Sequence, residues 1–95
     1  MPKIMIVEDE DDIVTLLRYN LESAGFEVAY ETNGGRALSA VEEQHPDLIL
    51  LDWMLPEKSG IDICRDIRDS NELRNIPIIM LTARGEEADK IEGLS

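Results

Sequence analysis

The chain has 95 residues, of which 43% are hydrophobic and 32% are charged, a composition typical of one folded domain. Its 21 acidic residues outnumber 9 basic ones, and the net charge of -12 repels nucleic-acid phosphates, which excludes DNA binding by this segment itself. Its apolar runs are far shorter than the roughly 20 residues that span a bilayer and no signal peptide is evident, so we expect a cytoplasmic protein without a membrane partner.

Short apolar runs alternate with helical patterns through the first half of the chain. Residues 3–7 and 26–31 each predict a strand. Between them, apolar residues recur at the spacing of one helical face: Ile13, Leu16, Leu17, Leu21 and Ala24. Gly25 follows where a left-handed residue ends a helix. A second helix, apolar at residues 37, 38 and 41, is expected to end before Pro46.

The second half of the chain repeats this alternation. Residues 47–51 predict a strand in which the last four positions are apolar in succession, which is typical of a parallel strand covered on both faces, and Asp52 follows directly. A loop at residues 54–60 precedes a third helix with its buried side at residues 63, 64 and 67. Residues 78–81 predict a fourth strand, residues 82–85 a turn and residues 86–94 the start of a fourth helix. The pattern predicts an α/β fold, a doubly wound parallel sheet with helices on both faces.

Acidic side chains follow two of the predicted strands. In such a sheet the carboxyl ends of the strands share one rim, which places Glu8 and Asp9, Asp52 and Thr82 together. Carboxylates packed at buried strand ends repel one another unless a cation neutralises them, and oxygen ligands suit magnesium. With that charge offset, the Asp52 carboxylate can attack phosphorus and accept a phosphoryl group. The Thr82 hydroxyl is placed to bond a phosphoryl oxygen, and the alternative is a β-branched residue that only ends the fourth strand.

A structural role is the alternative for each of these acids. Residues 10–12 are best explained as a solvated helix start, because the helix dipole favours carboxylates there. An isolated strand-end aspartate such as Asp52 would more often cap the next segment. The presence of Glu8 and Asp9 at the same predicted rim favours a phosphoryl-accepting role for Asp52 over a capping role.

Four motifs stand out in the sequence: Val7-Glu8-Asp9, Leu50-Leu-Asp52-Trp-Met-Leu-Pro56, Ser59-Gly60 and Leu81-Thr-Ala83. Together they resemble the receiver domain of two-component response regulators, and their amino-acid sequences are most similar to those of the OmpR/PhoB subfamily. The resemblance covers the whole chain, residues 1–95, as one receiver domain. It implies a flavodoxin-like, CheY-like fold with strand order 2-1-3-4, and a phosphorelay signalling domain rather than an enzyme.

The resemblance also implies roles for individual residues. Asp9, Asp52 and the backbone carbonyl of Met54 are expected to hold Mg²⁺. Glu8 is expected to act on the ion through water. Asp52 is expected to take a phosphoryl group from a sensor histidine kinase, and Thr82 to contact that group and switch a transcriptional output domain. DNA would be contacted only through a C-terminal effector domain.

The chain departs from the receiver pattern at its C-terminal end. Receivers carry a lysine at the end of a fifth strand and an aromatic switch residue on that strand, and the sequence stops before either. We therefore expect a C-terminally incomplete receiver that lacks the fifth strand and fifth helix. Its apolar edge would favour receiver–receiver association or a domain-swapped oligomer.

Two other functions remain open at this point. A pseudo-receiver would keep the fold as an interaction module that works without phosphorylation, and the missing lysine is its support. An aspartyl-phosphate phosphatase of the haloacid dehalogenase type needs a second acid two residues after the nucleophile. Met54 occupies that position here, which disfavours the phosphatase.

Overall fold

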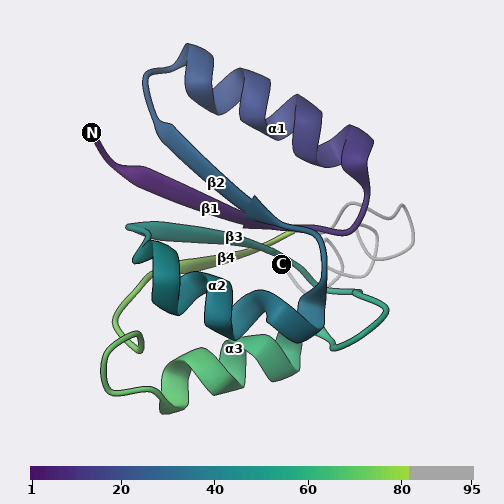
Figure 1. The fold of residues 1–95 in the computed structure, drawn as a ribbon, viewed down its shortest axis with the longest axis vertical. Helices are drawn as coiled ribbons and strands as arrows, with labels where there is room; N and C mark the ends of the chain where they lie inside the picture. Colours follow the sequence, from purple (N-terminus) through teal and green to yellow (C-terminus); the bar gives the residue numbers. More distant parts are fainter. Residues whose placement is uncertain (82–95) are drawn as a thin grey trace, which may run out of the picture.

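Four strands form one parallel sheet in the order β2-β1-β3-β4 in the computed structural model, which describes residues 1–81 (Figure 1). Their bounds agree with the expected strands within one residue: β1 Lys3–Val7, β2 Glu27–Glu31, β3 Leu48–Asp52 and β4 Ile78–Leu81. The order and the parallel pairing confirm the predicted doubly wound sheet. The turn and the fourth helix predicted over residues 82–94 lie outside the described residues.

Helices cover both faces of this sheet. Helix α1 (Asp11–Ser23) lies on one face, whereas α2 (Ala37–Gln44) and α3 (Gly60–Asp69) lie on the other (Figure 1). A short 3-10 helix, η1 (Gly34–Arg36), leads from β2 into α2. Within residues 1–81, no helix is long and apolar enough to cross a membrane.

The main hydrophobic core lies between the sheet and the pair α2 and α3. Its buried members come from β1, β3, α2, α3 and the loops on either side of α3: Met5, Val7, Ala37, Val41, Ile49, Leu51, Leu55, Ile63, Ile67 and Leu73. Burial of each large aliphatic side chain stabilises the fold by about 1.5–3 kcal/mol. Since β1 and β3 contribute alternate residues to this core, their pairing and register are fixed, and so are the side chains at their carboxyl ends.

The prediction of which residues form the apolar face of α1 is wrong at two positions. Leu16 is 61% exposed and Ala24 is also exposed, whereas Val14 is buried and Leu17 and Leu21 are half-buried. Val14, Leu17 and Leu21 follow spacings of three and four and form the stripe that faces the sheet. Leu16 is two residues after Val14, about 200° around the helix, so it points to solvent.

Gly25 ends α1 as expected. Its φ of +96° is a left-handed conformation that glycine adopts without a steric penalty. The Gly25 N–H donates to the Glu22 carbonyl at 3.0 Å, and the Phe26 N–H donates to the Leu21 carbonyl at 3.1 Å. This pair of bonds is the Schellman motif, and it turns the chain directly into β2.

Candidate functional site

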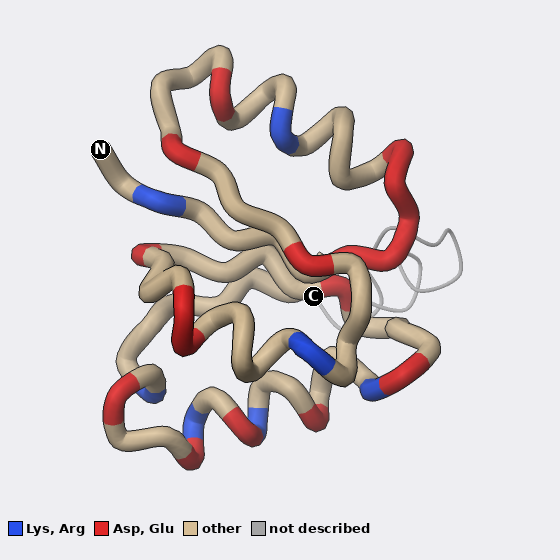
Figure 2. Tube along the Cα trace, viewed as in Figure 1, with Lys and Arg blue, Asp and Glu red and all other residues tan. Residues whose placement is uncertain are grey.

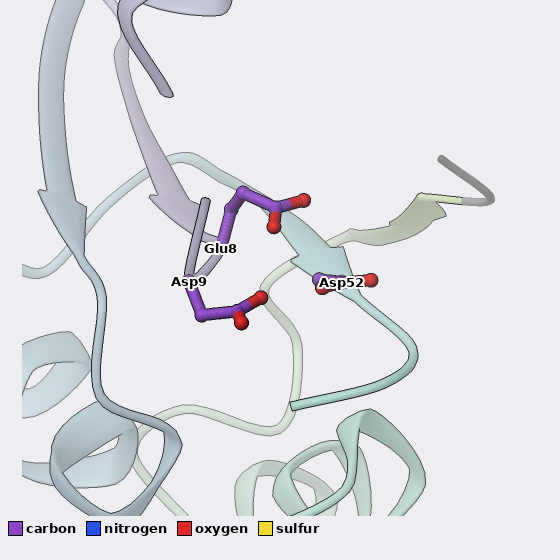
Figure 3. Close-up of side chains that lie close together, drawn as sticks. All are labelled: Glu8, Asp9 and Asp52. Carbon is purple, nitrogen blue, oxygen red and sulfur yellow. The ribbon is translucent and has the colours of Figure 1, made fainter. Parts of the chain in front are cut away.

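Three carboxylates converge where β1 and β3 end. Glu8 and Asp9 directly follow β1, and Asp52 is the last residue of β3. The strands are parallel neighbours in which Val7 pairs with Leu51, so the residues that follow each pair also lie side by side. Figure 3 shows the three side chains pointing toward one another, and one carboxylate oxygen from each lies within 4.8 Å of the others.

The cluster is withdrawn from solvent although it carries three acids. Glu8 is 0% exposed and Asp52 is 1% exposed, whereas Asp9 is half-buried. Figure 2 shows that the acidic stretch continues from the end of β1 into the start of α1, so no lysine or arginine stands in this stretch. Burial of an ionised carboxylate costs several kcal/mol unless a partner compensates for the lost hydration. The cluster therefore requires a proton or a cation.

Backbone N–H groups hold two of the carboxylates in place. The Glu10 N–H donates to Glu8 Oε2 at 3.1 Å, and the Met54 N–H donates to Asp52 Oδ1 at 3.2 Å. Among the described residues, Glu8 Oε1 receives no N–H or O–H donor. It shares the buried space with the oxygens of Asp9 and Asp52, so the three acceptors surround a position that favours positive charge.

The surroundings of Glu8 raise its pKa from 4.5 to about 7. Burial is the largest cause, because it disfavours the charged form. The Glu10 N–H opposes this effect by stabilising the carboxylate. The negative charge of Asp52 and hydrogen bonds with Asp9 and Asp52 raise the pKa further. A proton on Glu8 is thus one way to relieve the repulsion, and a divalent cation is another.

The donor set fits magnesium. The ligand atoms are carboxylate oxygens, with no histidine or cysteine in the group. Hard cations prefer such oxygens, and magnesium keeps several waters while it takes only one or two carboxylates. Asp9 is half-buried and Asp52 is nearly inaccessible, so the cluster is more open to solvent at Asp9 than at Asp52.

The two other predicted site residues follow β3 and β4. Met54 lies beside the cluster, because its N–H is bonded to Asp52. Thr82 lies outside the described residues, so its contact with a phosphoryl group stays a prediction. Leu81, the residue before it, pairs with Asp52 in the sheet. The described part of β4 therefore ends at the same rim as the carboxylates.

Sequence reasoning missed how the loop between β3 and α3 is anchored. Glu57 Oε1 accepts the Gly34 N–H at 3.1 Å, and Lys58 forms an ion pair with Asp66. The Glu57 contact joins residues that are 23 positions apart, and no local pattern signals it. Ser59, by contrast, caps α3 and could have been recognised, because serine just before an apolar helical pattern is a typical N-cap.

Comparisons with known proteins agree with this geometry. The family model described as "Response regulator receiver domain" matches residues 4–95. The phosphate regulon transcriptional regulatory protein PhoB of Rhizobium meliloti is 53% identical over 95 residues, 100% of this chain and 42% of that protein. The alkaline phosphatase synthesis transcriptional regulatory protein PhoP of Bacillus subtilis is 49% identical over 92 residues, 97% of this chain and 38% of that protein. The chain thus spans about two fifths of the length of these curated relatives.

A solved structure supports the same assignment. The N-terminal domain of a response regulator receiver protein from Methanoculleus marisnigri superposes with a TM-score of 0.84 at 32% identity. The match covers 97% of this chain and 77% of that one. With a family model that matches nearly its whole length and relatives about half identical to it, this chain belongs to the response regulator receiver domain family.

Proposed function

We propose that this chain is the phosphoryl-accepting domain of a response regulator of the PhoB/PhoP type, with Asp52 as the acceptor. The observation that carries the proposal is the buried carboxylate cluster of Glu8, Asp9 and Asp52 at the carboxyl ends of β1 and β3. Membership of the receiver family supports it, as do relatives whose names describe transcriptional regulators. The phosphoryl donor would be a phosphohistidine of a sensor histidine kinase in the cytoplasm.

The same cluster would hold the cofactor. Asp9 and Asp52 would bind magnesium through carboxylate oxygens, and Met54 through its backbone carbonyl. Glu8, which lies in the same cluster, would act through a bound water. When bound, magnesium would offset the negative charge that collects on the phosphoryl oxygens during transfer.

Asp52 would perform the chemical step. One of its carboxylate oxygens would attack phosphorus in line with the phosphorus–nitrogen bond of the phosphohistidine. That bond would break, its electrons would return to the imidazole, and an acyl phosphate would form on Asp52. The Met54 N–H, which donates to Asp52 Oδ1, would keep the carboxylate oriented at the end of the rigid strand.

Phosphorylation of Asp52 would act on partner domains through a change of conformation. Thr82 would bond the phosphoryl group and bias an equilibrium between two arrangements of the surface near β4. That change would alter association with a second receiver or with an output domain. DNA would be contacted only by an effector domain beyond this segment, since the segment itself carries a net charge of -12.

Incubation with acetyl phosphate and Mg²⁺ should add one phosphoryl group to the protein, measured by intact mass. The Asp52→Asn variant should show no addition, because an amide is not a competent nucleophile. Asp62→Asn, which alters an exposed acid in the first turn of α3, should be modified like the wild type. Addition that persisted in Asp52→Asn, or that never occurred in the wild type, would refute the proposed function and favour a pseudo-receiver.

A further inference from the structure

The loop between β3 and α3, residues 53–59, begins beside the carboxylate cluster. The Met54 N–H donates to Asp52 Oδ1 at 3.2 Å, and the carbonyl of the same residue is a proposed magnesium ligand. The Met54 side chain is 52% exposed, so its own packing restrains this backbone only weakly. The position of the loop must therefore be set by contacts elsewhere along it.

The middle of this loop lies against η1. Glu57 Oε1 accepts the Gly34 N–H at 3.1 Å. Gly34 is buried, and a Cβ there would lie 2.9 Å from the Lys58 carbonyl oxygen and 3.2 Å from the Leu55 side chain. The two segments thus touch along their backbones, as their neighbouring paths in Figure 1 also show. Glu57 provides the side-chain hydrogen bond that joins them.

The far end of the loop is fixed on α3. Lys58 forms an ion pair with Asp66, which is six residues after the start of that helix. The Gly60 N–H donates to the Trp53 carbonyl at 2.8 Å, which closes the loop on itself. With both ends held and Leu55 buried in the core, the bond from Glu57 to Gly34 adds a further restraint on the middle of the loop.

We propose that Glu57 is a positioning residue for the magnesium site. By accepting the Gly34 N–H, it holds the 53–59 loop so that the Met54 backbone stays beside Asp52. The inference rests on the proposed function, because it assigns Glu57 a part in binding the same cation. Hydrogen bonds that orient metal ligands alter affinity about 10–100-fold, and because Glu57 is exposed we expect about fivefold to tenfold.

Two substitutions of Glu57 show whether its effect on magnesium binding comes from the hydrogen bond to the Gly34 N–H or from its negative charge. Glu57→Ala removes the acceptor and the charge together. Glu57→Gln removes the charge but keeps an oxygen that can accept the Gly34 N–H. In Mg²⁺ titrations followed by Trp53 fluorescence, Glu57→Ala should raise the Kd about fivefold to tenfold, and Glu57→Gln should stay within about twofold of the wild type. In the metal-free proteins, exchange of the Gly34 amide hydrogen should accelerate in Glu57→Ala only.

The remaining outcomes would overturn the inference in distinguishable ways. An equal loss of Mg²⁺ affinity in both variants would show that the charge of Glu57 matters and that its hydrogen bond to Gly34 does not. Wild-type affinity in Glu57→Ala would show that the loop is positioned without Glu57. A wild-type protein that did not respond to Mg²⁺ at all would refute the proposed magnesium site itself, together with the inference that depends on it.

Discussion

Glu8→Gln should stabilise the metal-free protein at pH 8 by about 1–3 kcal/mol relative to the wild type. The folded state raises the pKa of Glu8 from 4.5 to about 7, chiefly through burial. The contribution of a protonated Glu8 to stability is complete below pH 4.5 and is lost as the pH rises through 7. Above pH 7 the wild type must bury a charge, whereas glutamine stays neutral and can donate to the neighbouring carboxylates.

Urea unfolding of both proteins in EDTA at pH 5 and pH 8 measures this effect. The advantage of the variant should fall below about 1 kcal/mol at pH 5, where the folded wild type is itself protonated at Glu8. Glu42→Gln, at an exposed position of α2, is the matched control and should show no such pH dependence. An advantage of the same size at both pH values would show that Glu8 does not carry the burial penalty.

Gly60→Ala should destabilise the fold by about 2–3 kcal/mol and should also weaken magnesium binding. A Cβ at Gly60 would lie 2.4 Å from the Asp52 carbonyl oxygen and 2.9 Å from the Trp53 Cα, both of which are backbone atoms. The higher helix propensity of alanine favours the variant by about 1 kcal/mol, which is smaller than the clash. Relief of the clash must move the start of α3 away from β3 or move the end of β3, which carries Asp52.

Thermal unfolding compares Gly60→Ala with Gly35→Ala. At Gly35 the nearest atom to a new Cβ is Asn33 Oδ1, at 3.1 Å, which belongs to a side chain and can move. Gly35→Ala should therefore change stability by less than about 1 kcal/mol. If Gly60→Ala unfolded at the same temperature as the wild type, the close packing of α3 on the backbone of β3 would not constrain the site.

The sequence predicted the sheet and the rim because their signals are local. Successive apolar residues predict β3 within one position of its observed bounds, and its last residue, Asp52, is polar because it reaches the rim. Parallel pairing then brings Glu8 and Asp9 to the same place. The sequence could not show that Glu8 is more buried than Asp9, because that depends on which face of the sheet each side chain meets.

Other features depend on tertiary contacts that no local pattern records. Both Val14 and Leu16 are apolar, so the sequence of α1 contains overlapping stripes, and only packing against the sheet decides that Val14 is buried. The bond from Glu57 to Gly34 joins two loops that lie far apart in the chain. Such contacts become visible only when the strands have placed the loops side by side.

Magnesium binding tests the central claim, that Glu8, Asp9 and Asp52 form one cation site. Trp53 is the single tryptophan of the chain and directly follows Asp52, so its fluorescence reports on the site. The wild type should show a saturable change with Mg²⁺, and Asp9→Asn and Asp52→Asn should each raise the Kd at least about tenfold. Asp62→Asn should bind like the wild type. An unchanged response in Asp9→Asn and Asp52→Asn would contradict the account, because the ion would then lie elsewhere.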